Sequence, residues 1–596
     1  MGQPPTPHGA YSERLAAREA SLRALQLRRL RLGTLRLLII LGFGAVCWLA
    51  WKGSASLWWA ALPLAIFVGL MWLQSRIQRD AELVRRGIRF YERGLARLEN
   101  RWQGDGESGE RFLSPQHPYG SDLDIFGKAS LFELLSTART RGGEAKLADW
   151  LSAPAPLDEL RRRHQAVDEL RPLLDLREQL AALGDDYRAG VHPDHLIAWA
   201  ETPAPPFPKA QRITALLFAA MQAGLLTWWL LSLFTDVRAE IAVLAFGLLE
   251  GAFALTLRGH IVGIIHGVHE ASHDLDLLSE LLAVLERQDF RSPRLQTLLD
   301  SIRSVGKPAS RNIARLRRWM ELLDSRDNVF VRLFGPPLLW GTQVAMAVEN
   351  WRAAHGPNVR AWLDAVSEIE ALSALANYAW EHPSDPWPEF AEGRVFEGDE
   401  LGHPLLPDSR CIRNSVALKD PLRLIVVSGS NMSGKSTLLR AVGINAVLAM
   451  AGAPVRARRL VLSHLSVGAS IRTMDSLEEG HSRFMAEILR LKQILELPEP
   501  ALFLLDELLG GTNSHDRAIG AEGLLHGLLE RGAIGITTTH DLSLARVADQ
   551  LAPVAINVHF EDRLENGRLV FDYTMRPGVV ARSNALDLMR AVGLKV

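Results

Sequence analysis

Four apolar runs, arranged in two pairs, constrain the fold of this chain more than any other feature of its sequence. The first pair covers residues 37–51 and 57–73, and the second covers residues 213–234 and 241–257. The runs lie near the roughly 17–25 residues that a helix needs to cross the hydrocarbon core of a bilayer. Because a backbone in lipid must satisfy its own hydrogen bonds, each pair is predicted to form a transmembrane helical hairpin.

Charged and aromatic residues around these runs predict their orientation. Arginines such as Arg36 and Arg76 flank the first pair, while Lys209 and Arg258 flank the second. Tryptophans cluster at the turn of the first pair, where an aromatic belt would lie. Positive charge marks the cytoplasmic side, so we expect a multi-pass protein of the inner (cytoplasmic) membrane with both ends of each hairpin in the cytoplasm. A signal peptide and a buried soluble hairpin are the alternatives.

The rest of the chain is predicted to be multi-domain, with a helical part followed by an α/β part. Apolar residues recur at three- and four-residue spacing around the second hairpin, as in packed helices. Beyond a proline-containing linker near residues 383–388, short apolar runs alternate with helices, which indicates a largely parallel sheet. The predicted N-terminal parts are a basic cytoplasmic segment (1–36), a transmembrane hairpin (37–74) and a basic juxtamembrane helical segment (75–119). They are followed by the first part of a helical core (120–210), a second transmembrane hairpin (211–258) and the rest of the core or lever (259–390). The last predicted part is a P-loop ATPase domain (391–596).

A glycine-rich loop after the predicted strand at residues 424–427 indicates a phosphate-binding site. The loop reads G-x4-G-K-S and leads into a helical run, which is the context that identifies a P-loop. Its backbone N–H groups can wrap phosphates, and the helix N-terminus adds a favourable field. We expect Lys435 to neutralise the β- and γ-phosphates and Ser436 to bind Mg²⁺. The predicted nucleotide-binding residues are Gly429, Ser430, Asn431, Met432, Ser433, Gly434, Lys435, Ser436 and Thr437.

Two further predicted strands supply the remaining chemistry of an ATP site. An apolar run at residues 501–505 ends in Asp506 and Glu507. We expect Asp506 to hold Mg²⁺ and Glu507 to act as the general base for the attacking water. The run at residues 534–539 ends in His540, which we expect to sense the γ-phosphate. Surface carboxylates and a structural histidine are the alternatives for these positions.

Several motifs resemble those of the MutS family. In the α/β domain they are GSNMSGKSTLLR (429–440), GHPLL (402–406), IRN (412–414), GHSRFMAE (480–487) and GTNSHD (511–516). Residues 130–151 and 161–170 are similar to the helical core of that family. The resemblance implies an ATPase that works as a homodimer and binds DNA, with the loop around Ser482 reaching the partner's γ-phosphate. Ser482 also precedes a helical pattern, which it is well placed to cap.

The sequence departs from that family in ways that bear on function. The N-terminal mismatch-reading and connector domains are missing from the pattern, and a basic segment and the first hairpin stand in their place. A net charge of −1 gives no overall basic excess for nucleic acid, so DNA contact is expected mainly with the phosphate backbone and is not clearly mismatch-specific. The alternative functions are an ATP-switched membrane scaffold with a protein partner and an ABC-type transport ATPase.

Two polar features near the second hairpin stay open to more than one interpretation. Glu250 lies inside the fourth apolar run, where a carboxylate is costly and often functional. A position near the membrane interface, or a neutral side chain, is the simpler alternative. His266, His269 and His273 recur at helical spacing and could bind a metal. A polar helix face at the membrane boundary is the simpler interpretation of these histidines.

Overall fold

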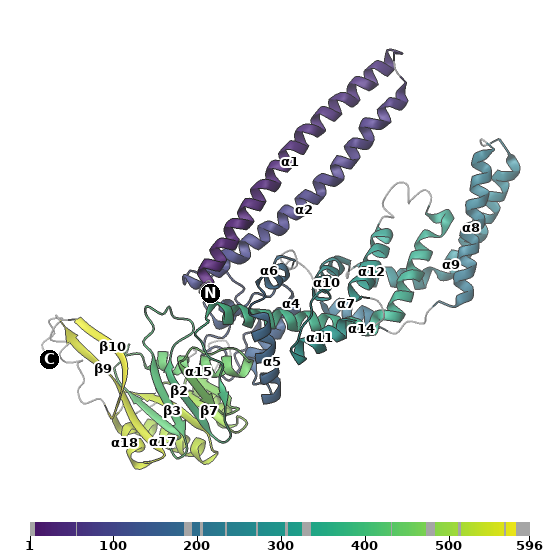
Figure 1. Ribbon diagram of the computed structural model, residues 1–596. Coiled ribbons are helices and arrows are strands. Elements are labelled where there is room, and N and C mark those ends of the chain that lie inside the picture. The colour runs from purple at the N-terminus through teal and green to yellow at the C-terminus, as the bar shows by residue number, and fades with distance from the viewer. Residues whose placement is uncertain are drawn as a thin grey trace. The chain divides into compact units, whose positions relative to one another are not determined.

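The structure of the protein is a computed structural model (Figure 1). It describes residues 6–54, 56–183, 193–202, 207–232, 235–269, 272–303, 308–324, 335–430, 432–471, 483–510, 514–540, 542–565 and 568–579. The chain divides into two compact units. The first unit comprises Met1–Thr137, Glu144–Arg177 and Ala371–Val596, and the second comprises Ala138–Gly143 and Glu178–Glu370.

Two long helices in the first unit form an N-terminal hairpin. Helix α1 (Pro7–Trp51) and helix α2 (Ala61–Leu98) are joined through the short helix η1 (Leu57–Ala60), and Figure 1 shows them lying side by side. The Thr6 hydroxyl caps α1 by accepting a hydrogen bond from the Gly9 N–H at 3.2 Å. Both helices run without a break from an apolar tip to an arginine-rich end, so the predicted limits at residues 37 and 74 fall inside helices.

The end of this hairpin opposite its tip is tightly packed, and we call it the foot. The Tyr11 ring centroid lies 5.7 Å from that of Tyr91 and 6.3 Å from that of Phe90, and all three side chains are buried. A Cβ atom on Gly94 would lie 2.5 Å from a ring carbon of Tyr11. Glycine at position 94 therefore allows α1 to approach α2 closely at the foot.

Helices make up most of the chain between the hairpin and residue 381. Up to residue 201 they are η2 (Glu110–Phe112), α3 (Leu131–Leu135), α4 (Arg141–Ser152), α5 (Leu157–Leu170), α6 (Leu174–Leu183) and α7 (Pro193–Glu201). The following elements are α8 (Lys209–Leu231), α9 (Val237–His269), α10 (Ser272–Leu285), α11 (Pro293–Arg303), α12 (Ala309–Asp324), η5 (Pro336–Leu338) and α14 (Trp340–Glu381). The helical character predicted around the second hairpin is confirmed, whereas the juxtamembrane segment predicted at residues 75–119 is helical only as far as Leu98 and in η2.

Helices α8 and α9 form a second hairpin within the second unit. The Phe218 ring packs edge-on against Phe246 and Phe253, and the Gln222 amide donates to the Val243 carbonyl at 3.3 Å. Glu250 is only 2% exposed and lines a cavity of about 590 Å³. Among the described residues, four helices are long and apolar enough to cross a membrane, namely Pro7–Trp51, Trp58–Leu98, Lys209–Leu231 and Val237–Gly259.

The C-terminal part of the first unit is built on a six-stranded sheet with the order β10-β9-β4-β8-β7-β6. Neighbouring strands are parallel except for β9 and β10. The strands are β4 (Leu424–Ser428), β6 (Ser466–Ser470), β7 (Ala501–Leu505), β8 (Ile534–Thr539), β9 (Ala555–Glu565) and β10 (Arg568–Pro577). Every residue of β4, β7 and β8 is buried, as expected for central parallel strands.

Helices cover this sheet, and a smaller sheet accompanies it. One face of the six-stranded sheet packs against α16 (Arg483–Leu495), α17 (Ser514–Glu530) and α18 (Leu542–Gln550). Helix α15 (Lys435–Ala451) meets the opposite face, because Gly443 approaches Leu504, whose neighbours Phe503 and Leu505 point the other way. The smaller sheet has the order β1-β5-β2-β3, with β1 (Glu389–Phe390), β2 (Val395–Leu401), β3 (Asn414–Lys419) and β5 (Arg459–Leu462).

The segment between α2 and α3 joins the N-terminal hairpin to this sheet. The Asp122 carboxylate accepts a hydrogen bond from the Ile471 N–H at 2.7 Å, and the Ala469 N–H donates to the Pro118 carbonyl at 2.9 Å. Leu123 is fully buried beside Gly443 of α15. Residues 118–123 therefore contact the core of the α/β part, whereas the sequence pattern places residues 118–119 at the end of the juxtamembrane segment and residues 120–123 at the start of the helical core.

Candidate nucleotide-binding site

The predicted phosphate loop connects the C-terminal end of β4 to the N-terminal end of α15. Its backbone is left-handed at Met432 and Gly434, with φ of 68° and 104°. A Cβ atom on Gly429 would lie 2.9 Å from the Ser433 hydroxyl and 3.1 Å from the Phe560 carbonyl. The two glycines thus allow a tight turn that leads directly into the N-terminus of α15, where anions bind favourably.

Lys435 begins α15 and folds back over this loop. Its side-chain Nζ donates to the carbonyl oxygens of Gly429 and Ser430, at 2.8 and 3.0 Å. Burial lowers the pKa of Lys435, while the nearby carboxylates of Glu507 and Asp506 act in the opposite direction. The ammonium group is therefore held at the loop, on the same side as two carboxylates.

Asp506 joins the loop to the two neighbouring strands. Its carboxylate accepts a hydrogen bond from the Ser436 hydroxyl at 2.5 Å and another from the Thr538 hydroxyl at the end of β8. Its backbone N–H donates to the Ser470 carbonyl at 2.8 Å. Ser436 and Asp506, which were each predicted to bind Mg²⁺, thus lie within hydrogen-bond distance of each other, and their binding of Mg²⁺ stays a prediction. Thr538 was not predicted, and only its place beside His540 at a strand end could have indicated it.

Glu507 and His540 lie together at the same edge of the sheet. The Nδ1 atom of His540 is 3.5 Å from Glu507 Oε1, and both side chains are partly exposed. Glu507 has a φ of 47°, and its N–H donates to the Thr538 hydroxyl at 3.2 Å. A non-glycine residue in the left-handed region is uncommon and is concentrated at functional sites. Glu507 lines the same cavity as the phosphate loop, whereas His540 lines a small neighbouring cavity together with Glu507.

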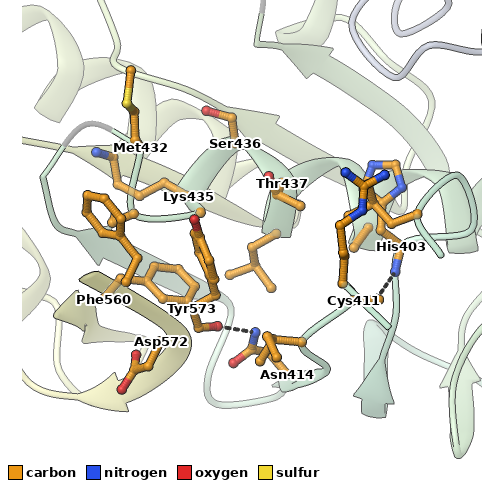
Figure 2. Close-up of a pocket in the computed structure, with 18 of the residues that line it drawn as sticks. His403, Cys411, Asn414, Met432, Lys435, Ser436, Thr437, Phe560, Asp572 and Tyr573 are labelled. Carbon is orange, nitrogen blue, oxygen red and sulfur yellow. Dashed lines mark hydrogen bonds between the residues drawn. The ribbon is translucent and has the colours of Figure 1, made fainter. Parts of the chain in front are cut away.

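A large cavity lies beside the phosphate loop, and several of the residues that line it were not predicted. It measures about 920 Å³, and Figure 2 shows Tyr573, Phe560 and Lys435 around the same space. Tyr573 has a φ of 51°, and a Cβ atom on Gly434 would lie 3.1 Å from its ring. The Phe571 ring stacks on Tyr573 with a centroid distance of 5.9 Å. The cavity therefore combines a polar phosphate loop with an aromatic wall.

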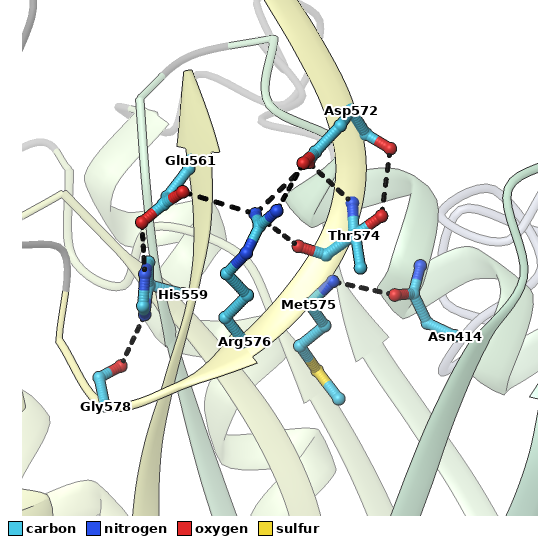
Figure 3. Close-up of polar contacts among 8 residues, drawn as sticks. All are labelled: Asn414, His559, Glu561, Asp572, Thr574, Met575, Arg576 and Gly578. Atoms are coloured by element: carbon cyan, nitrogen blue, oxygen red, sulfur yellow. Dashed lines mark hydrogen bonds and ion pairs between the residues drawn. The ribbon is translucent and has the colours of Figure 1, made fainter. Parts of the chain in front are cut away.

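Asn414 fixes the strand that carries this aromatic wall. Its amide donates to the Tyr573 carbonyl at 3.0 Å (Figure 2), and its carbonyl oxygen accepts from the Met575 N–H at 2.8 Å (Figure 3). Arg576 forms an ion pair with Asp572 at 2.5 Å on the other side of the strand. The pairing of β9 with β10 is irregular between Phe571 and Met575. The IRN motif, which ends in Asn414, was the sequence signal near this contact.

Some predicted residues lie outside the described part of the chain. Asn431 and Ser482 are among them, as are residues 580–596 at the C-terminus. The side chains of His266, His269 and His273 are also not described. Helix α16 begins at Arg483, directly after Ser482, and its Glu487 carboxylate accepts a hydrogen bond from the Leu509 N–H at 2.6 Å. The predictions for Asn431 and Ser482 therefore stay predictions.

A mostly parallel sheet, a phosphate loop between β4 and α15, and two carboxylates after β7 together define a P-loop nucleotide-binding domain. Residues 425–595 match the family model of MutS domain V. This match supports membership of the MutS family for the part of the chain that holds the site.

Individual relatives point to the same family. The chain is 34% identical over 213 residues to an endonuclease MutS2 of Thermus thermophilus, covering 34% of this chain and 27% of that relative. It is 32% identical over 237 residues to a DNA mismatch repair protein MutS 2 of Halobacterium salinarum, covering 39% and 27%. It is 29% identical over 261 residues to a DNA mismatch repair protein MutS of Geobacillus thermodenitrificans, covering 43% and 28%. The chain thus spans little more than a quarter of these relatives.

Proposed function

We propose that this chain is a membrane-anchored, MutS-like ATPase that binds and hydrolyses ATP on the cytoplasmic side of the membrane. The observation that carries the proposal is the meeting of the Ser436 hydroxyl and the Asp506 carboxylate, 2.5 Å apart, beside Lys435 at the cavity. Hydroxyl and carboxylate oxygens are the ligands that Mg²⁺ prefers. The residues thus fit a nucleotide with its metal ion.

Each side chain of the site has a role in this proposal. The loop N–H groups and Lys435 would hold the phosphates, and Ser436 and Asp506 would hold Mg²⁺. When bound, Mg²⁺ would neutralise charge on the phosphate oxygens. Glu507 would accept a proton from the attacking water, with His540 beside it to contact the γ-phosphate. The Tyr573 ring offers a flat apolar face to a nucleotide base.

The membrane anchor is supported by both helical hairpins. Their long helices expose apolar side chains, and Trp51 and Trp58 at the first turn are 84% and 86% exposed. Water would penalise such a surface, because burying apolar area is worth roughly 25 cal/mol per Å². Arginine and lysine at the outer ends favour a cytoplasmic location for both ends of each hairpin.

The proposal includes a homodimer with composite sites and contact with DNA. The support for both is the similarity to MutS domain V and the relatives named for DNA mismatch repair. Without a recognisable reading domain, DNA would be held mainly through its phosphates, so affinity should fall steeply with salt. A mismatch should change the binding free energy by less than about 1 kcal/mol, below the usual penalty of roughly 1–3 kcal/mol per base pair.

The test is nucleotide binding, hydrolysis and DNA binding by the full chain in detergent or lipid nanodiscs. Wild type should bind a fluorescent ATP analogue and release phosphate, whereas Lys435→Ala should do neither. If Lys435→Ala hydrolyses ATP like wild type, the ATPase assignment is refuted. If ATP is hydrolysed but no duplex, mismatched or branched DNA is retained at low salt, an ATP-switched scaffold replaces DNA binding as the function.

A further inference from the structure

The C-terminal end of α14 fastens the foot of the α1–α2 hairpin. Glu381, the last residue of α14, accepts hydrogen bonds from Arg97 Nε and Nη2 at 2.8 and 2.6 Å. The Tyr11 hydroxyl donates to the same carboxylate at 3.1 Å. The side chains of Glu381 and Arg97 are 2% and 10% exposed. A buried bidentate pair fixes geometry and is costly to break, so the foot and the end of α14 move together.

The residues just after Glu381 contact Arg456. The His382 Nδ1 atom lies 2.9 Å from Arg456 Nη1, and the Asp385 carboxylate lies 3.6 Å from the same nitrogen. The Tyr378 hydroxyl donates to Asp385 at 3.3 Å. Burial lowers the pKa of His382 to about 3, and the charge of Arg456 acts in the same direction. His382 is therefore neutral at physiological pH, and its Nδ1 can accept a hydrogen bond from the guanidinium.

The other side of Arg456 holds one wall of the candidate nucleotide cavity, residues 402–412, which we call the pocket wall. Arg456 Nη2 donates to the Asp408 carboxylate at 2.6 Å, and the Arg456 carbonyl accepts from the Gly402 N–H at 2.7 Å. The Arg456 N–H donates to the Asn445 side chain at 2.6 Å, and Asn445 in turn donates to the Gly402 carbonyl at 2.9 Å. The Arg456 side chain thus holds the pocket wall at Asp408, and its backbone carbonyl holds the wall at Gly402.

We propose that Arg456 is a positioning residue that couples the foot of the α1–α2 hairpin to the nucleotide cavity. The guanidinium is 7% exposed and has partners on both sides. A shift of the end of α14 must therefore either move the pocket wall or break one of the two ion pairs of Arg456, of which the pair with Asp385 is buried and the pair with Asp408 is partly exposed. Because coupling between two sites is reciprocal, a nucleotide that moves the pocket wall also shifts the foot. This inference rests on the proposed nucleotide binding and adds its regulation by the membrane hairpin.

The first experiment measures the affinity of a fluorescent ATP analogue for the full chain in nanodiscs. Arg97→Met removes the ion pair with Glu381 on the hairpin side and leaves the residues of the cavity unchanged. We expect it to weaken nucleotide binding by about fivefold, at the low end of typical coupling. In an Arg456→Met background, which weakens binding by itself, Arg97→Met should have no further effect. The matched control is Arg459→Met, which removes an exposed bidentate pair with Glu389 and should bind like wild type.

Two results would overturn the coupling. One is an Arg97→Met protein that binds the analogue as tightly as wild type. The other is an Arg97→Met effect of equal size with and without Arg456, which would show that the effect does not pass through this residue. A wild-type protein that binds no nucleotide would instead refute the proposed function, so the two failures are distinguishable.

A second measurement makes its deciding comparison on the wild-type protein, in which no substitution can weaken the fold. Hydrogen exchange of wild type in nanodiscs is followed at residues 88–98, with and without the ATP analogue. Nucleotide should slow exchange at the foot in wild type and in Arg459→Met, and should leave it unchanged in Arg456→Met. Identical exchange at the foot in wild type with and without nucleotide contradicts the proposal.

Discussion

The Ser436 hydroxyl donates a hydrogen bond to the Asp506 carboxylate at 2.5 Å, which brings the start of α15 and the end of β7 to a single point. Lys435 precedes Ser436 at the start of the same helix, and its Nζ donates to the carbonyl oxygens of Gly429 and Ser430. The side-chain oxygens of Ser436 and Asp506 would bind Mg²⁺ in the proposed ATP complex. Their roles can be separated by substitution, because one partner is neutral and the other is charged.

Asp506→Asn should cost more activity than Ser436→Ala. The asparagine removes the negative charge that would hold Mg²⁺, so we expect ATP hydrolysis to fall on the order of 100-fold, or about 2.7 kcal/mol. The measurement is phosphate release across a magnesium titration, in which Asp506→Asn should require more Mg²⁺. Equal magnesium dependence of Asp506→Asn and wild type would exclude Asp506 as a ligand.

Glu507→Gln should separate binding from chemistry. Glutamine keeps the shape of the side chain and leaves the phosphate loop intact, but it cannot accept the proton of the attacking water. We expect unchanged affinity for ATP and a loss of hydrolysis of roughly 10²–10⁴-fold. Single-turnover hydrolysis and analogue binding test this directly. If the variant hydrolyses ATP at the wild-type rate, another group is the base.

The membrane topology can be read by labelling single cysteines in a background without Cys47 and Cys411. Ser54 and Asp236 lie at the turns of the two hairpins, and Asp105 lies in an exposed loop after α2. Under the positive-inside rule, a membrane-impermeant reagent should label Ser54→Cys and Asp236→Cys in intact cells and reach Asp105→Cys only after lysis. Labelling of Asp105→Cys from outside would reverse the topology.

Local patterns predicted the elements of the site well. The strands expected at residues 424–427, 501–505 and 534–539 are confirmed as β4, β7 and β8, because continuous apolar runs report directly on burial from both faces. Asp506 and Glu507 followed from one of those runs, since carboxyl ends of parallel strands share an edge. Ser436 and Asp506 were each expected to bind Mg²⁺, and the structure places them within hydrogen-bond distance of each other.

Contacts between distant segments could not be predicted in the same way. Tyr573 reaches Gly434 because β10 bends at an irregular pairing, which no periodicity reports. Arg97 meets Glu381 and Arg456 meets Asp408 through ion pairs, and a charged residue in a sequence carries no sign of its partner. Side-chain periodicity identifies a buried face but leaves open which element covers it.

His403 should make the stability of the α/β part sensitive to acid. Burial, assisted by the charge of Arg440, lowers the pKa of His403 to about 4. Since its unfolded pKa is about 6.5, the stability gained from the neutral ring is present above pH 6.5 and is lost as the pH falls toward 4. His403→Asn retains an acceptor for the Leu405 N–H, which now donates to His403 Nδ1 at 3.2 Å.

The measurement is thermal unfolding of the full chain in detergent between pH 7.5 and 4.5, on wild type and His403→Asn. The wild type should lose stability relative to the variant as the pH falls, by on the order of 2–3 kcal/mol. Exposed His526 supplies the control, and His526→Asn should follow the wild-type profile. Parallel profiles for wild type and His403→Asn would show that His403 does not titrate with unfolding.

The composite dimer site makes the most specific prediction. Lys435→Ala removes the phosphate contact of one subunit, and Ser482→Ala removes the hydroxyl that the partner would present to the γ-phosphate. Each variant alone should be inactive or slow. In a mixed dimer, the Ser482→Ala chain keeps an intact phosphate loop and the Lys435→Ala chain keeps an intact Ser482, so one complete site remains. An equal mixture should therefore recover about a quarter of wild-type ATPase activity, because half the dimers of a two-fold assembly are mixed and each has one of two sites. Differently tagged chains and a two-step purification establish that mixed dimers form. If they form and remain inactive, Ser482 does not act across the interface, and hydrolysis must be explained within one chain.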